Sequence, residues 1–146
     1  MAMRTDAEIE SLVRAFEDGS LPRSGWTHRE HLTVALWYLR HHPREEATGR
    51  IREGIRRFNL SHGNTTGYHE TITLAWVAVI ARFLADRDER QPLWRLVVGL
   101  LEQCGDKDYL LQFYSNNVLM SDEARRGWVP PDLRPLESPA RFPRRP

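Results

Sequence analysis

Two histidines stand three residues apart in the segment GWTHREHL, residues 25–32. Residues with this spacing share one face of an α-helix, with Cβ atoms about 5–6 Å apart, so His28 and His31 can act together if the segment is helical. Thr27 and Glu30 form the T-x-x-E pattern of a capping box, which predicts that a helix begins at His28. Both imidazoles then lie in the first turn, where the helix dipole favours the neutral, metal-binding form.

A third histidine is predicted in a matching place. His69 precedes the apolar segment of residues 72–84 and follows the polar loop SHGNTTG, so it lies in the first turn of another helix. If these two helix ends meet, His28, His31 and His69 converge. Three histidines with an open fourth position are typical of a catalytic metal centre. The sequence therefore predicts one divalent transition metal, with zinc or iron as the first choices, because imidazole suits several such metals.

Glu70 is the predicted catalytic residue of this centre. A carboxylate beside a metal acts as a further ligand or as general base on a bound water. The same residue also fits the third position of a capping box in which Gly67 is the N-cap, and acidic residues are favoured there by the helix dipole. Both interpretations stay open at this point.

Three further residues are predicted to bind a substrate. Trp26 precedes the histidine pair in a loop, so its side chain can cover a pocket beside the two histidines. Alternatively, a tryptophan just before an N-cap can pack on His31 as a hydrophobic staple. Tyr114 belongs to a polar cluster that follows a helix. Arg125 lies on a short predicted helix and can hold a carboxylate or phosphate, or pair with a surface acid such as Glu123.

Apolar periodicity predicts helices throughout the chain. The expected helices cover residues 6–18, 28–42, 44–60, about 68–87, 92–104 with Pro92 at N1, about 107–115 with Asp106 as cap, and a short turn after Ser121. No stretch of useful length alternates as a strand does. The helix near residues 72–84 is apolar on nearly every side, which predicts a buried central element. The expected fold class is all-α: a compact single-domain bundle of five to six main helices.

The chain of 146 residues is long enough to bury one core. We expect one helical domain over residues 1–133, followed by an extended Pro/Arg-rich tail over residues 134–146, where the sequence is LRPLESPARFPRRP from Leu133 onward.

Composition excludes several classes of function. The net charge of +1 argues against a nucleic-acid-binding protein, and no run approaches the roughly 18 apolar residues of a membrane span. The N-terminal segment lacks the apolar core of a signal peptide, and the lone Cys104 forms no internal disulfide, so a cytoplasmic location is expected. The oligomeric state stays open, and a homodimer is possible.

Two functional hypotheses follow. The first is a small metal-dependent enzyme that acts on a small organic substrate by hydrolysis or by metal-dependent oxidation. The alternative is a non-catalytic helical module that binds a protein or a small ligand. In that case the histidines are structural residues at helix ends.

Overall fold

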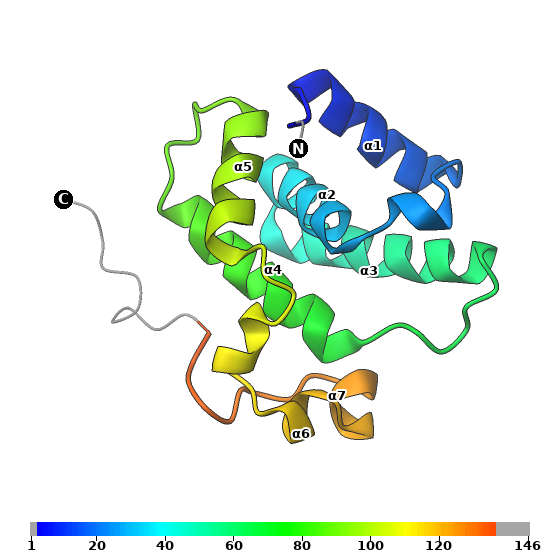
Figure 1. The fold of residues 1–146 in the computed structure, drawn as a ribbon, viewed down its shortest axis with the longest axis vertical. Helices are drawn as coiled ribbons and strands as arrows, with labels where there is room; N and C mark the ends of the chain where they lie inside the picture. The colour runs from blue at the N-terminus through cyan, green and yellow to red at the C-terminus, as the bar shows by residue number, and fades with distance from the viewer. Residues whose placement is uncertain (1–2, 137–146) are drawn as a thin grey trace.

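The computed structural model describes residues 3–136, and every regular element in this range is a helix (Figure 1). The all-α fold class is therefore confirmed. Five long helices form the body, and two short ones follow near the C-terminus. They are α1 (Asp6–Asp18), α2 (His28–His41), α3 (Arg44–Ser61), α4 (Glu70–Ala85), α5 (Leu93–Cys104), α6 (Asn116–Leu119) and α7 (Asp122–Arg126). Within residues 3–136, no helix is both long and apolar enough to cross a membrane.

Side-chain hydrogen bonds set the helix boundaries that the sequence predicted. At the start of α1, Thr5 and Glu8 form a reciprocal capping box, and Gly19 ends the helix with a left-handed φ of 82°. At the start of α2, the Glu30 carboxylate accepts hydrogen bonds from the backbone amide and the hydroxyl of Thr27. These bonds fix His28 as the first residue of α2.

Two predicted helix starts were wrong, and the helix predicted over residues 107–115 does not form as one element. Pro92 is the N-cap of α5 and not its first helical residue. Asp106 does not cap a helix, because its side chain accepts the amide of Asp108 at 2.8 Å and closes a turn. The chain then forms a 3₁₀ turn, Tyr109–Gln112, before Ser115 caps the unpredicted helix α6 through the amide of Val118.

The helices α2 and α4 lie at the centre of the molecule. Helix α2 packs against α1, α3, α4 and α5, while α4 packs against α2, α3, α5 and α7 (Figure 1). Buried side chains such as Leu32 and Leu36 of α2 and Ala75 and Ile80 of α4 are at most 1% exposed. The prediction of α4 as a buried central element agrees with this arrangement.

The segment after α7 turns back beside α4. The amides of Leu133 and Arg134 both donate to the Phe113 carbonyl, at 2.9 and 3.3 Å, and Leu136 is buried. The packed chain therefore reaches Leu136, three residues into the tail that was predicted to begin at residue 134. The rest of that tail, residues 137–146, lies outside the described residues.

Candidate functional site

The histidine pair at the start of α2 is partly buried and packs against aromatic rings. The His31 ring lies tilted on Trp26, with ring centroids 4.1 Å apart, and His28 and Trp76 meet edge to face, with centroids 5.2 Å apart. The Nε2 atoms of both histidines are buried and have no hydrogen-bond partner among the described protein atoms. Burial lowers the pKa of both rings, and that of His31 falls to about 4, helped by the neighbouring His28. Both imidazoles are therefore neutral near pH 7.

His69 does not join this pair. It is the N-cap of α4, where its Nδ1 accepts the amide of Ile72 at 3.1 Å, and its Nε2 donates to the carbonyl of Leu119 at 2.7 Å. Both ring nitrogens are thus occupied in one neutral tautomer. Burial lowers the pKa of His69, and the charge of Arg125 acts in the same direction.

The crossing of α2 and α4 explains why the three histidines stay apart. His28 meets α4 at Trp76, seven residues after His69, which corresponds to about 10 Å along a helix axis. Among residues 3–136, no group of three or more histidine, cysteine, aspartate or glutamate side chains is placed to hold a metal ion. The predicted three-histidine cluster is therefore not supported, and metal binding stays a prediction.

Glu70 forms an ion pair away from the histidines. Its carboxylate accepts two hydrogen bonds from Arg52, at 3.0 and 2.7 Å, and one from the Tyr68 hydroxyl at 2.5 Å. The hydrogen bonds from Arg52 lower the pKa of Glu70 against the opposing effect of burial. The capping-box interpretation of Glu70 was wrong, because Glu70 is the first residue of α4 and His69 is its cap.

The three predicted substrate-binding residues make structural contacts. Trp26 is sandwiched between His31 and Phe16, at centroid distances of 4.1 and 4.5 Å, which matches the hydrophobic-staple alternative. Tyr114 is fully buried, and its hydroxyl donates to the Val129 carbonyl at 2.7 Å. Arg125 donates to the Thr66 carbonyl at 3.4 Å.

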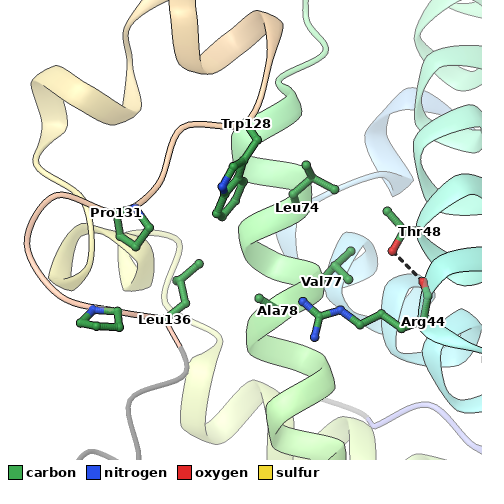
Figure 2. A pocket seen from close by; sticks show the side chains of 9 residues that line it. Arg44, Thr48, Leu74, Val77, Ala78, Trp128, Pro131 and Leu136 are labelled. Carbon is green, nitrogen blue, oxygen red and sulfur yellow. Dashed lines mark hydrogen bonds between the residues drawn. The ribbon is translucent and has the colours of Figure 1, made fainter.

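A groove with a mainly apolar lining lies on a different face, over the middle of α4 (Figure 2). Its volume is about 450 Å³, within the range of small-molecule sites. Helix α4 forms the floor, α3 forms one wall, and the segment after α7 forms the other (Figure 2). We call it the Trp128 groove; its lining residues are Arg44, Thr48, Leu74, Val77, Ala78, Trp128, Pro131, Pro135 and Leu136.

Thr71 fixes the position of Trp128. Its hydroxyl, on the first turn of α4, donates to the Gly127 carbonyl at 2.6 Å and accepts the Val129 amide at 3.0 Å. These two groups flank Trp128 in the chain, so one buried hydroxyl holds the backbone on both sides of the indole. The Tyr114 hydroxyl holds the Val129 carbonyl as well. Trp128 itself stays 46% exposed, with its ring lying over α4 beside Leu74 (Figure 2).

The α3 wall supplies the polar groups of the Trp128 groove. The Arg44 side chain extends from the start of α3 toward Val77 and Ala78, and the Thr48 hydroxyl donates to the Arg44 carbonyl at 2.7 Å (Figure 2). None of the described lining residues is acidic. The groove therefore has an apolar floor on α4, a wall that carries the Trp128 ring, and the positive charge of Arg44 on its α3 side.

A second large groove, of about 700 Å³, lies between α1, α2 and α5. Five of its described lining side chains are charged and of mixed sign, and two of them, Arg4 and Glu30, pair with each other at 2.9 Å. Burial opposes ionisation of Glu30, but hydrogen bonds from Thr27 and Arg4 still lower its pKa. Such a surface stays well hydrated, so the Trp128 groove is the better candidate for an apolar ligand.

Sequence reasoning missed the Trp128 groove. The available signal was the apolar surface all round residues 72–84, which is broader than the single apolar face of an ordinary surface helix. It indicates that a further segment must pack there. The hydrogen bonds of Thr71 with Gly127 and Val129 determine which segment packs there. Residue spacing in the sequence does not predict these hydrogen bonds.

No family model matches the sequence, and comparisons with curated proteins and with solved structures give no match.

The buried neutral state of His31 predicts a pH-dependent stability. Between pH 6.5 and about 4 the unfolded chain binds a proton at His31 and the folded chain does not, so acidification favours unfolding. The His31 contribution to the free energy of unfolding should fall by up to about 3 kcal/mol across this interval. His31→Gln should therefore reduce the slope, and the contributions of His28 and His69, whose pKa values burial also lowers, should remain. Denaturant titrations at several pH values measure the free energy of unfolding and its slope with pH.

The control variant is His41→Gln, at the exposed end of α2, which should keep the slope of the wild type. An unchanged slope in His31→Gln would contradict the account.

Replacing Thr71 tests whether its hydroxyl positions Trp128. Thr71→Val keeps the shape but leaves the Gly127 carbonyl and Val129 amide without their partner, so unfolding should become easier by about 1–3 kcal/mol. The indole N–H resonance of Trp128 should shift, whereas Thr71→Ser should retain the native shift. Thr73→Val is the control, because the Thr73 hydroxyl bonds within α4 to the His69 carbonyl. Equal effects of both valine variants would refute the positioning role.

Proposed function

We propose that this protein is a non-catalytic helical module that binds a small apolar molecule in the Trp128 groove. The observation that carries the proposal is a groove of about 450 Å³ with seven apolar lining residues, one of which is the exposed Trp128, beside Arg44 and Thr48. Trp128 is 46% exposed while hydrogen bonds hold the backbone on both sides of it, so its ring is positioned and still accessible to a ligand.

The lining residues also indicate which class of ligand fits the groove. Trp128 presents a ring face for stacking, and Pro131 and Pro135 offer rigid apolar surfaces beside it. Leu74, Val77 and Ala78 give an apolar floor (Figure 2). Arg44 and Thr48 place positive charge and a hydroxyl at the α3 side. The best match is a ring-bearing apolar molecule whose polar end accepts hydrogen bonds or carries a negative charge.

The same proposal gives the histidines a structural role. His28 and His31 fill the space at the start of α2 as neutral aromatic rings, and His69 caps α4. All three roles match the alternative drawn from the sequence, in which the histidines are structural residues at helix ends.

A titration with three matched naphthalenes tests the proposal. The compounds 1-naphthoate, 1-naphthalenemethanol and 1-naphthylmethylamine share one ring system and differ in charge. We expect saturable shifts of the Trp128 indole N–H, with the other four tryptophan indoles unchanged, and weakest binding of the cationic amine because Arg44 repels it. Trp128→Ala should weaken binding about tenfold, or ~1.4 kcal/mol.

Leu133→Ala is the matched control. Leu133 is 57% exposed in the same segment but does not line the groove, so its removal should change the affinity less than twofold. Absence of a saturable shift with all three compounds would overturn the proposal. Equal losses in Trp128→Ala and Leu133→Ala would show nonspecific adsorption to exposed apolar residues.

A second candidate is the metal-dependent enzyme predicted from the sequence. One observation favours it: the Nε2 atoms of His28 and His31 have no partner among the described atoms, and both rings are neutral near pH 7. Two imidazoles on one helical face would supply two ligands, with His69 excluded by its hydrogen bonds.

Elemental analysis of untagged protein tests this second candidate, before and after incubation with zinc or anaerobic iron(II). The metal-enzyme hypothesis requires that the wild type and His69→Ala both bind near-stoichiometric metal and that His28→Ala loses it. No retained metal after either incubation would contradict it.

A further inference from the structure

A smaller groove, lined mostly by residues with polar side chains, lies where α3 ends and residues 62–69 lead into α4. Its volume is about 330 Å³, and we call it the Arg56 groove. Its lining residues are Arg56, Asn59, Leu60, Asn64, Thr65 and Tyr68. It shares no lining residue with the Trp128 groove. Four of its six residues carry side-chain hydrogen-bond donors besides the tyrosine, and none of the described lining residues is acidic.

Arg56 is the charged group of this groove. Its guanidinium lies over the Tyr68 ring, 4.6 Å from the centroid, which holds a planar cation in place. Among the described ion pairs Arg56 takes no part. The neighbouring Glu70 carboxylate accepts two hydrogen bonds from Arg52 and one from the Tyr68 hydroxyl, and the charge of Arg56 helps to lower its pKa. No described lining residue of the groove is acidic, so Arg56 has no ion-pair partner within the groove itself.

The loop places neutral donors beside this cation. The Asn64 side-chain oxygen accepts the amides of Thr66 and Gly67, at 3.2 and 2.8 Å, which fixes the plane of the Asn64 amide. Its Nδ2 group packs over Gly67, where any larger residue would collide with it. The two N–H bonds of Nδ2 take no part in the described hydrogen bonds. The Thr65 hydroxyl and the Asn59 amide are further donors on the same lining.

We propose that the Arg56 groove binds an oxyanion, namely a phosphate or carboxylate group of a small molecule. Arg56 supplies the positive charge, and Asn64, Thr65 and Asn59 supply directed donors to the anionic oxygens. Leu60, which is 63% exposed, gives an apolar edge for the rest of the ligand. This site is independent of the Trp128 groove, and it assigns a role to the SHGNTTG loop.

Nuclear magnetic resonance titrations with inorganic phosphate and with acetate test the proposal on the intact chain. Ionic strength is held constant with sodium chloride, so that screening does not change during the titration. We expect saturable shifts of the Asn64 side-chain amide, the Thr65 backbone amide and the Arg56 Nε–H. Saturation with phosphate, with acetate or with both identifies the oxyanion. No saturable shift with either anion overturns the proposal.

Two neighbouring arginines of α3 provide matched variants. Arg56→Gln and Arg57→Gln each remove one positive charge from the exposed side of the helix, but Arg57 does not line the groove. Arg56→Gln should weaken binding at least tenfold, and Arg57→Gln less than twofold. Equal losses would show general attraction to a basic surface and would contradict a defined site. Thr65→Val keeps the charge and should still weaken binding several-fold, with thermal melts confirming that each variant folds.

Discussion

The structure depends on the need to cover α4 on all sides. This helix is apolar around nearly its whole circumference, and exposed apolar surface costs about 25 cal/mol per Å². Helices α2, α3 and α5 cover most of it, and α7 covers its first turns. The remaining strip at Leu74, Val77 and Ala78 faces the non-helical segment that contains Trp128. Covering a helix with an irregular segment leaves imperfect packing, and the Trp128 groove is the result. The groove is thus a consequence of how the core is closed.

Polar groups at helix ends hold this arrangement together. The Thr71 hydroxyl joins the first turn of α4 to the backbone on both sides of Trp128, and His69 joins the same end of α4 to the carbonyl of Leu119 at the end of α6. The N-terminal end of α4 therefore organises the C-terminal part of the chain. His28 and His31 serve the start of α2 differently, as neutral rings packed on tryptophans. Histidine suits both tasks because it combines an aromatic face with two hydrogen-bonding nitrogens.

Much of the fold could be predicted from the sequence, because its signals are local. The capping box at Thr27 and the serine at position 121 marked the starts of α2 and α7 within a few residues of the pattern itself. The site could not be predicted in the same way. Three histidines in similar helix-start positions suggested convergence, yet His28 at the start of α2 contacts α4 at Trp76, two turns beyond His69. Spacing fixes the face of a helix on which a residue lies, but it does not fix where two helices cross. The Thr71 hydrogen bonds span more than 50 residues and leave no local pattern.

The most direct test of the central claim is a measurement of contacts between a bound ligand and the groove. Isotope-filtered nuclear Overhauser spectra of the protein with 1-naphthoate report which protein protons lie within about 5 Å of the naphthalene ring. The account predicts contacts from the naphthalene ring to the Trp128 indole and to the methyl groups of Leu74 and Val77. These three residues line the Trp128 groove together. Contacts to the charged groove between α1, α2 and α5 instead, for example to Trp94 or Leu101, would contradict it.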